Sequence, residues 1–230
     1  MPAKRPKLGH PEPVELLPTP SLEHRDAVLE ERRRNARQMG EIALRFKALH
    51  EKAYTDELTG LGNRRLFEES FPQHFDFARN NGITLALAFA DVRGLKRTNK
   101  KSGYPKGDDL LRSAAKSFQQ IVREGDIVAR IGGDEFAAIL VGYSPKPGQS
   151  QAELNQETAE RLSGSFVTQA QKHGIPDELH VGLDVAIINE TDHDTHLSMF
   201  DKADKALRAL QKQEYINLDE MGITFVDSRL

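Results

Sequence analysis

Residues 130–136 read Arg-Ile-Gly-Gly-Asp-Glu-Phe, and the expected arrangement of the domain follows from this segment. Apolar runs flank it on both sides, at residues 127–129 and 136–141, and each run has the content of a buried strand. The Gly-Gly pair between them predicts a tight hairpin turn. Such a turn would hold the carboxylates of Asp134 and Glu135 at an exposed tip, where glycine lets a bulky ligand approach the backbone closely.

A second acidic residue follows a different kind of strand. Residues 84–90 are apolar on both faces, which is typical of a central strand, and they run directly into Asp91. A buried carboxylate needs a partner. If this strand lies beside the hairpin, Asp91 and Asp134 meet at the sheet edge. Two such carboxylates suit Mg²⁺ ions that also hold substrate phosphates, activate an attacking hydroxyl and neutralise a leaving pyrophosphate.

Composition limits the class of protein. The chain has 230 residues, of which 38% are hydrophobic and 29% charged, and this suits one packed domain with extensions. A formal net charge of −3 gives no basic field for nucleic acid, and the lack of cysteine excludes disulfides and thiolate metal sites. No apolar run approaches the roughly 20 residues of a membrane span. We therefore expect a cytoplasmic protein with no membrane span and no nucleic-acid partner.

The first 54 residues have a composition of their own. Residues 1–20 are rich in proline and have little to bury, which predicts a disordered tail. Residues 21–54 lack proline and carry a mostly apolar heptad repeat, interrupted by Arg25 and Arg32, which predicts an amphipathic helix. Two interpretations stay open for this helix. It could fold back on its own domain, or it could form the coiled-coil stalk of a parallel dimer.

Hydrophobic periodicity predicts the remaining elements. A turn-rich loop at residues 56–65 precedes a helix over about residues 65–79, in which Pro72 marks a kink or break. Asp108 is the expected N-cap of a helix over about residues 109–123. Further on, the pattern predicts a polar loop at 148–155, a helix over 156–173, a strand over 181–187 and a helix over 199–215.

Four motifs in one order and spacing carry a family resemblance. They are Asp-x-Leu-Thr-Gly-Leu-x-Asn-Arg-Arg at residues 56–65, Asp91 with Lys96 and Asn99, Gly107-Asp108, and the stretch at residues 130–136. Together they resemble the GGDEF family of diguanylate cyclases, over about residues 55–230. The resemblance implies an α/β (α+β), palm-like domain whose mostly antiparallel sheet is wrapped by helices. It also implies that a homodimer, with one GTP and Mg²⁺ (or Mn²⁺) per subunit, condenses two GTP into cyclic di-GMP and releases pyrophosphate.

The resemblance assigns roles to single residues of this chain. The metal ligands would be Asp91, the Val92 carbonyl and Asp134, and the catalytic residues would be Asp134, Glu135 and Lys96. Glu135 would contact the metal or activate the 3′-hydroxyl. The substrate-binding residues would be Asn99 and Asp108 at the guanine, the backbone of Gly94 and Leu95 at the phosphates, and Gly133 in the turn. Arg123 and Asp126 match an R-x-x-D inhibitory site for cyclic di-GMP, for which an exposed ion pair is the alternative.

Several positions depart from the family pattern. Aspartate, phenylalanine, histidine and glycine are usual where this chain has Arg93, Leu95, Tyr104 and Asp184. A lysine and an arginine that grip the triphosphate are replaced by Gln211 and Tyr215, which carry no positive charge. Two functions therefore stay open. One is an active diguanylate cyclase with product feedback. The other is a weak or inactive module that binds cyclic di-GMP or GTP and signals through its N-terminal region, where a regulatory partner could act.

Overall fold

The computed structural model describes residues 22–212 and 223–226, and the chain divides into two compact units, residues 1–48 and 49–230. Helix α1 (Leu22–Tyr54) makes up the described part of the first unit and continues into the second. In the first unit, large apolar side chains are at least half exposed at Leu29, Met39, Ile42, Leu44 and Phe46. The tail predicted for residues 1–20 lies outside the described residues.

The second unit is built on a six-stranded sheet with the order β1-β3-β4-β2-β5-β6. Its strands are β1 (Gly62–Asn63), β2 (Leu85–Arg93), β3 (Ile127–Arg130), β4 (Glu135–Val141), β5 (Gly182–Asn189) and β6 (Ile223–Val226). Every pairing between neighbours is antiparallel except the short parallel contact of β1 with β3. The predicted mostly antiparallel sheet is therefore confirmed, with β2 at its centre.

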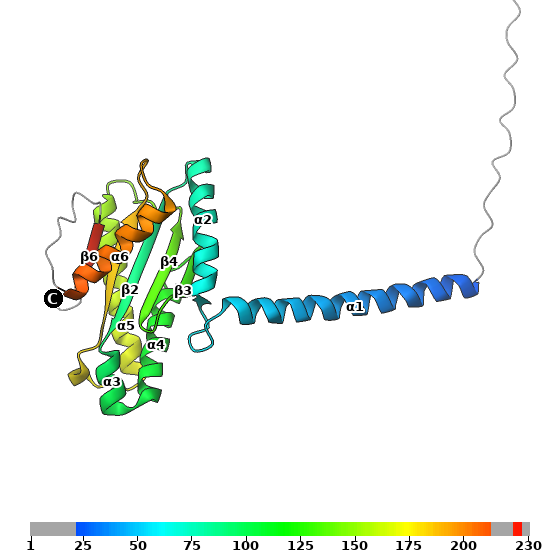
Figure 1. Ribbon diagram of the computed structural model, residues 1–230, viewed down its shortest axis with the longest axis horizontal. Helices are drawn as coiled ribbons and strands as arrows, with labels where there is room; N and C mark the ends of the chain where they lie inside the picture. Colours follow the sequence, from blue (N-terminus) through cyan, green and yellow to red (C-terminus); the bar gives the residue numbers. More distant parts are fainter. Residues whose placement is uncertain (1–21, 213–222, 227–230) are drawn as a thin grey trace, which may run out of the picture. The chain divides into compact units, whose positions relative to one another are not determined.

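Helices cover both faces of this sheet (Figure 1). They are α2 (Arg64–Asn81), α3 (Leu95–Ser102), α4 (Tyr104–Gln119), α5 (Gln151–Lys172), the 3₁₀ turn η1 (Asp177–Leu179) and α6 (His196–Lys212). Alternate residues of β2 define the two cores. Ala86, Ala88 and Ala90 pack against α4 and α5, while Leu87 and Phe89 pack on the side of α2 and α6. Among the described residues, no helix is long and apolar enough to cross a membrane.

Local capping explains where the structure differs from the predicted elements. Asp108 is not an N-cap, because α4 begins at Tyr104 after Gly103 and Asp108 lies inside the helix. Helix α5 begins before residue 156, because Ser150 and Glu153 form a capping box in the segment expected to be a loop. Helix α2 continues through Pro72 without a break. Helix α3, which the periodicity did not predict, has one buried residue, Thr98.

Candidate active site

The end of β2 and the start of β4 bring the predicted acidic residues together. In the ladder between these strands, Asp91 is the direct partner of Glu135, so their side chains lie on the same face of the sheet. One residue further, the Val92 amide donates a hydrogen bond of 2.9 Å to the Asp134 carbonyl. The hairpin tip is therefore fixed against the end of the central strand. Asp91, Val92, Asp134 and Glu135 meet at one edge, as the sequence predicted.

Backbone hydrogen bonds shape the turn that presents these acids. The amides of Ile131 and Gly132 both donate to the Glu135 carbonyl, at 2.9 and 3.2 Å. A side chain at position 132 would displace the Glu135 carboxylate from its place beside the turn, so glycine allows this close packing. Gly133 is exposed at the tip, and Asp134 and Glu135 are half-buried. Within the described part of the chain, neither of these two carboxylates has a hydrogen-bond or ion-pair partner.

The oxygen ligands at this edge fit a hard divalent cation. Across the described ranges, no three His, Cys, Asp or Glu side chains gather closely enough to hold a metal ion by themselves. Mg²⁺ commonly takes one or two carboxylates and completes its shell with water and substrate phosphates. Asp91 and Asp134, with the Val92 carbonyl beside them, offer that donor set. These residues would hold the ion, and the phosphates of a bound nucleotide would replace some of its water ligands.

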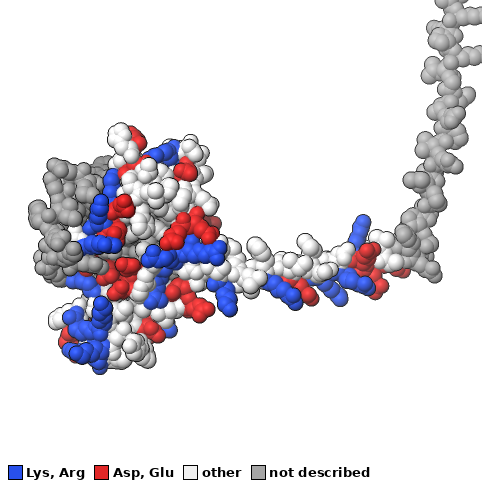
Figure 2. Space-filling view, in the orientation of Figure 1, with Lys and Arg blue, Asp and Glu red and all other residues white. Residues whose placement is uncertain are grey.

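The predicted phosphate loop follows β2 directly. Gly94 is the N-cap of α3 and has a φ of 88°, a conformation that favours glycine. A Cβ at this position would also lie 3.1 Å from a Val181 methyl group, so glycine relieves crowding as well. Lys96 is exposed in the first turn of α3, within reach of an anion at the loop. Four exposed cationic side chains lie in this helix, at Lys96, Arg97, Lys100 and Lys101. Figure 2 shows basic side chains gathered at that end of the domain.

The predicted guanine readers lie on the adjoining helices α3 and α4. The Asn99 Oδ1 atom is buried, and no described donor hydrogen-bonds it. Gly107 makes room for this oxygen, because any Cβ at position 107 would collide with it. Asp108 is half-buried, and its carboxylate likewise has no partner among the described residues. An unpaired buried acceptor is unfavourable without a ligand, so both side chains are suited to receive donors from a bound molecule.

The R-x-x-D motif lies in the turn before β3. The carboxylate of Asp126 accepts the Arg123 amide at 2.8 Å and the Val141 amide at 2.9 Å. Asp126 therefore holds the turn against β4, a structural role that the sequence analysis missed. A cavity of about 60 Å³ lies beside it, lined by Arg123, Asp126, Tyr143 and Arg161 among others. Burial raises the pKa of Tyr143 to about 12, so its hydroxyl stays protonated.

Two further charged contacts lie beside the site and were not predicted. Arg93 Nε lies 2.9 Å from Asp184 Oδ1, between the ends of β2 and β5. Arg130 Nη1 lies 3.3 Å from Asp56 Oδ2, and Arg130 Nη2 donates to the Gly133 carbonyl at 2.7 Å. Each pair joins residues far apart in the sequence. They could be found only once the strand register was known.

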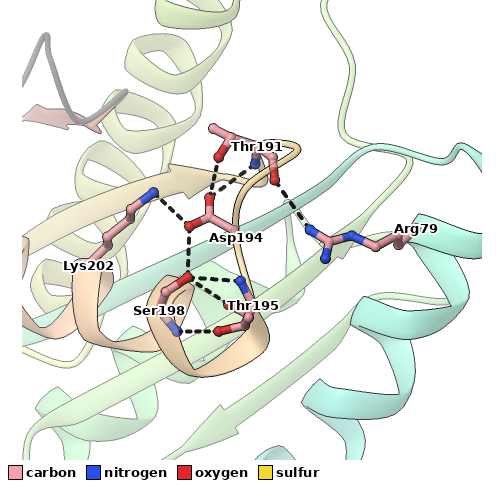
Figure 3. A network of polar contacts seen from close by, with 6 residues as sticks. All are labelled: Arg79, Thr191, Asp194, Thr195, Ser198 and Lys202. Atoms are coloured by element: carbon pink, nitrogen blue, oxygen red, sulfur yellow. Dashed lines mark hydrogen bonds and ion pairs between the residues drawn. The ribbon is translucent and has the colours of Figure 1, made fainter.

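A separate buried network, also not predicted, lies at the start of α6 (Figure 3), beyond Asn189 and so at the other end of β5 from Asp184. Asp194 is 3% exposed and accepts hydrogen bonds from Thr191, Ser198 and Lys202. Burial alone would raise the pKa of this carboxyl, but the hydrogen bonds from these three residues outweigh it and lower the pKa. The network fixes the start of α6, which the structure describes as far as Lys212. Of the two altered phosphate positions, Gln211 is described only in its backbone, and Tyr215 lies outside the described part.

Comparisons with known proteins show which family the chain resembles. The family model "Diguanylate cyclase, GGDEF domain" matches residues 53–215. Diguanylate cyclase DgcP of Pseudomonas aeruginosa is 30% identical over 157 residues, which cover 68% of this chain and 22% of that protein. The cyclic di-GMP phosphodiesterase NbdA of the same species is 35% identical over 52% of this chain and 15% of its own length. The chain thus spans about a fifth or less of the length of these relatives.

Solved structures show the same fold. The coiled coil and GGDEF domain of DgcB from Caulobacter crescentus, in complex with c-di-GMP, covers 80% of this chain and 95% of its own, with a TM-score of 0.62 and 23% identity. Diguanylate cyclase SiaD of Pseudomonas aeruginosa, in complex with its activator SiaC, covers 84% of this chain and 70% of its own, with a TM-score of 0.58 and 25% identity. The sheet, the acidic edge and these matches lead to one conclusion: the chain belongs to the diguanylate cyclase GGDEF domain family.

Proposed function

We propose that this protein is a diguanylate cyclase that converts two GTP molecules into cyclic di-GMP and two pyrophosphates. The observation that carries the proposal is the meeting of Asp91 with the hairpin tip, because it gathers carboxylates where a triphosphate and its cation would bind. The exposed cations of α3 support it, since they attract a polyanion to the adjoining loop. The names of several relatives favour the same reaction.

Each half of the proposed reaction is one phosphoryl transfer. The 3′-hydroxyl oxygen of one GTP attacks the α-phosphorus of the other, the new O–P bond forms, and the bond to pyrophosphate breaks. Glu135 accepts the hydroxyl proton, because its carboxylate lies at the tip beside Asp134 and has no described partner. Lys96 and the amides at the start of α3 bind the phosphates. A bound Mg²⁺ would neutralise charge on the leaving pyrophosphate.

Two chains are needed for this chemistry, because each holds one nucleotide. The second transfer is the same reaction with the roles of the two GTP molecules exchanged, which suits two equivalent sites facing each other. The exposed apolar side chains of α1 in residues 22–48 support a homodimer, since a second copy could cover them. A regulator acting on the N-terminal region would then change the rate by changing how the two sites meet.

A second candidate is a module that binds cyclic di-GMP or GTP without turnover. The replacement of two phosphate-binding cations by Gln211 and Tyr215 favours it, because a neutral side chain holds a triphosphate less tightly. The match to a protein named for phosphodiesterase activity is in line with this alternative. In that case Arg123 would be the main ligand contact, and α1 would carry the signal.

Turnover of GTP distinguishes the two candidates. The purified protein is incubated with GTP and Mg²⁺, and cyclic di-GMP is measured by chromatography. Asp134→Ala should abolish product formation, while its unfolding temperature stays the same or rises, because an acidic neighbour of Glu135 is removed. Asp201→Ala, which changes an exposed aspartate of α6, is the matched control and should keep full activity. Product formation by Asp134→Ala would contradict the site, and ligand binding without product in the unmodified protein would favour the second candidate.

A further inference from the structure

Asp184, the partner of Arg93, adds a third carboxylate beside two acidic residues of the predicted site. On one side of β2, Asp91 is paired in register with Glu135 of β4. On the other side, Asp91 is paired with Asp184 of β5. Directly paired residues of antiparallel strands point to the same face, with Cβ atoms about 5 Å apart. Glu135, Asp91 and Asp184 thus form a row of three carboxylates across three strands, which we name the carboxylate row.

Arg93 lies at one end of this row, on the same face of β2 as Asp91. Its direct partner on β5 is Gly182, which has no side chain, so Arg93 has space to run diagonally toward Asp184. The Nε atom of Arg93 lies 2.9 Å from Asp184 Oδ1. The Asp184 side chain is 4% exposed and the Arg93 side chain is 24% exposed. The guanidinium is therefore held beside a buried carboxylate, while part of the Arg93 side chain stays in contact with solvent.

Charge explains why this pair matters for the neighbouring cation site. Opposed carboxylates on a sheet repel one another, and an added carboxylate strengthens the attraction for a divalent cation. Three carboxylates and one guanidinium give the row with Arg93 a formal charge of −2. Without Arg93 the charge would be −3, and the extra carboxylate would draw the cation toward β5 and away from Asp134.

We propose that Arg93 is a positioning residue that lowers the cation affinity of the carboxylate row and keeps the cation at Asp91 and the neighbouring Asp134, away from Asp184. Asp184 holds Arg93 in this place. The proposal rests on the proposed function, because the row acts as a cation site only if the nucleotide reaction takes place there. It gives a role to two residues that the family pattern does not explain, since they stand where aspartate and glycine are usual.

Four variants of the 230-residue chain test the proposal, because each sets the charge of the row in a known way. Mn²⁺ binding without nucleotide is measured by titration calorimetry. Arg93→Met should bind Mn²⁺ at least about tenfold more tightly than the unmodified protein, because one nearby positive charge is lost. Asp184→Asn should bind it more weakly by a similar factor. The double variant Arg93→Met/Asp184→Asn and the charge-conserving Arg93→Lys should both return close to the unmodified value.

Controls separate this inference from the proposed function. Arg208→Met removes an exposed arginine that pairs with Asp204, so it changes the total charge equally and should leave Mn²⁺ binding unchanged. Asp91→Asn should abolish Mn²⁺ binding, and if it does not, the proposed cation site is wrong. If Asp91→Asn abolishes binding but the folded Arg93 and Asp184 variants all bind like the unmodified protein, the role of Arg93 is wrong. If Arg93→Met does not fold, two other variants still test the proposal. Asp184→Asn should bind Mn²⁺ more weakly than the unmodified protein, and the double variant should recover the unmodified affinity.

Discussion

Arg130 Nη1 lies 3.3 Å from Asp56 Oδ2, and this contact joins the loop that follows α1 to the turn that presents the signature acids. The same guanidinium donates to the Gly133 carbonyl at 2.7 Å. Both side chains are mostly buried, so the pair is shielded from water. One arginine therefore holds the junction of α1 and the tip of the hairpin in a fixed relation. The Gly133 carbonyl held in this way immediately precedes Asp134 in the chain.

Removing this arginine should loosen the turn. Arg130→Met is expected to lower the free energy of unfolding by about 1–3 kcal/mol, because it deletes charged hydrogen bonds and leaves Asp56 without its cation. Urea denaturation measures the change. Arg208→Met, which breaks the exposed pair with Asp204, should shift stability by less than about 0.5 kcal/mol. Equal stabilities of the two variants would contradict the role given to Arg130.

The Asp194 network predicts a pH dependence of stability. The pKa of Asp194 is lowered in the folded protein, so the unfolded chain binds more protons and stability falls as the pH is lowered. The stabilisation from ionised Asp194 is fully present above the ordinary aspartate pKa of about 3.9. It is lost as the pH falls through the lower pKa that Asp194 has in the folded protein. Asp194→Asn should cost about 1–3 kcal/mol at pH 7 and less below pH 4. A constant difference between the two proteins from pH 7 to pH 3 would exclude this origin.

Asp108 predicts the choice of nucleotide. Guanine offers its N1–H and exocyclic amine to a carboxylate, whereas the corresponding edge of adenine does not offer this pair of donors. A buried acceptor left unpaired by the wrong base should favour GTP over ATP by at least about a hundredfold in kcat/KM. Asp108→Asn should reduce that preference. Asp109→Asn is the matched control, because Asp109 pairs with Lys106 and Arg112 instead.

Product binding should depend on the two residues of the R-x-x-D motif in different ways. Arg123→Ala should remove cyclic di-GMP binding and leave synthesis intact, because a guanidinium makes strong charge-assisted hydrogen bonds to phosphate. Asp126→Ala should lower the unfolding temperature, since its carboxylate holds the Arg123 and Val141 amides. Calorimetry and thermal unfolding measure the two effects. Unchanged binding in Arg123→Ala would rule out an inhibitory site here.

The α1 helix predicts a dependence on protein concentration. Synthesis needs two chains, so the rate per molecule should fall when the protein is diluted. If residues 1–48 are deleted, this loss of activity should already begin at a higher protein concentration. The cut at residue 48 retains Tyr54, whose hydroxyl donates to Glu69 at 2.6 Å. A deletion variant with the same rate per molecule at every dilution would contradict a dimer stalk.

The acidic edge could be predicted from sequence because its signals are local. Two apolar runs around Gly-Gly specify the hairpin, and a strand that is apolar on both faces must be central. The starts of α4 and α5 were also readable, although they were missed. Pro105 in the first turn of α4 points to a start before Asp108, and Ser150 with Glu153 is a capping-box pattern.

Other features have no local signal. Helix α3 buries little and is rich in lysine and arginine, so it has no hydrophobic period to detect. The pairing of Arg93 with Asp184 depends on the register of β2 and β5, which a single sequence does not fix. In the same way, the structural role of Asp126 depends on the Val141 amide of another strand. Long-range contacts between polar groups decide these details.

The central place of β2 has a consequence for amide hydrogen exchange. Strand β2 is paired with β4 on one side and β5 on the other, and its residues from Leu85 to Val92 are buried. Amide protons in such a strand exchange with solvent only when the whole domain opens, so they should be among the slowest in the protein. Amides in the exposed turn at residues 132–134 can exchange through local opening. Ligand-induced protection should therefore develop at this turn, while the strand that carries Asp91 reports the global stability of the domain.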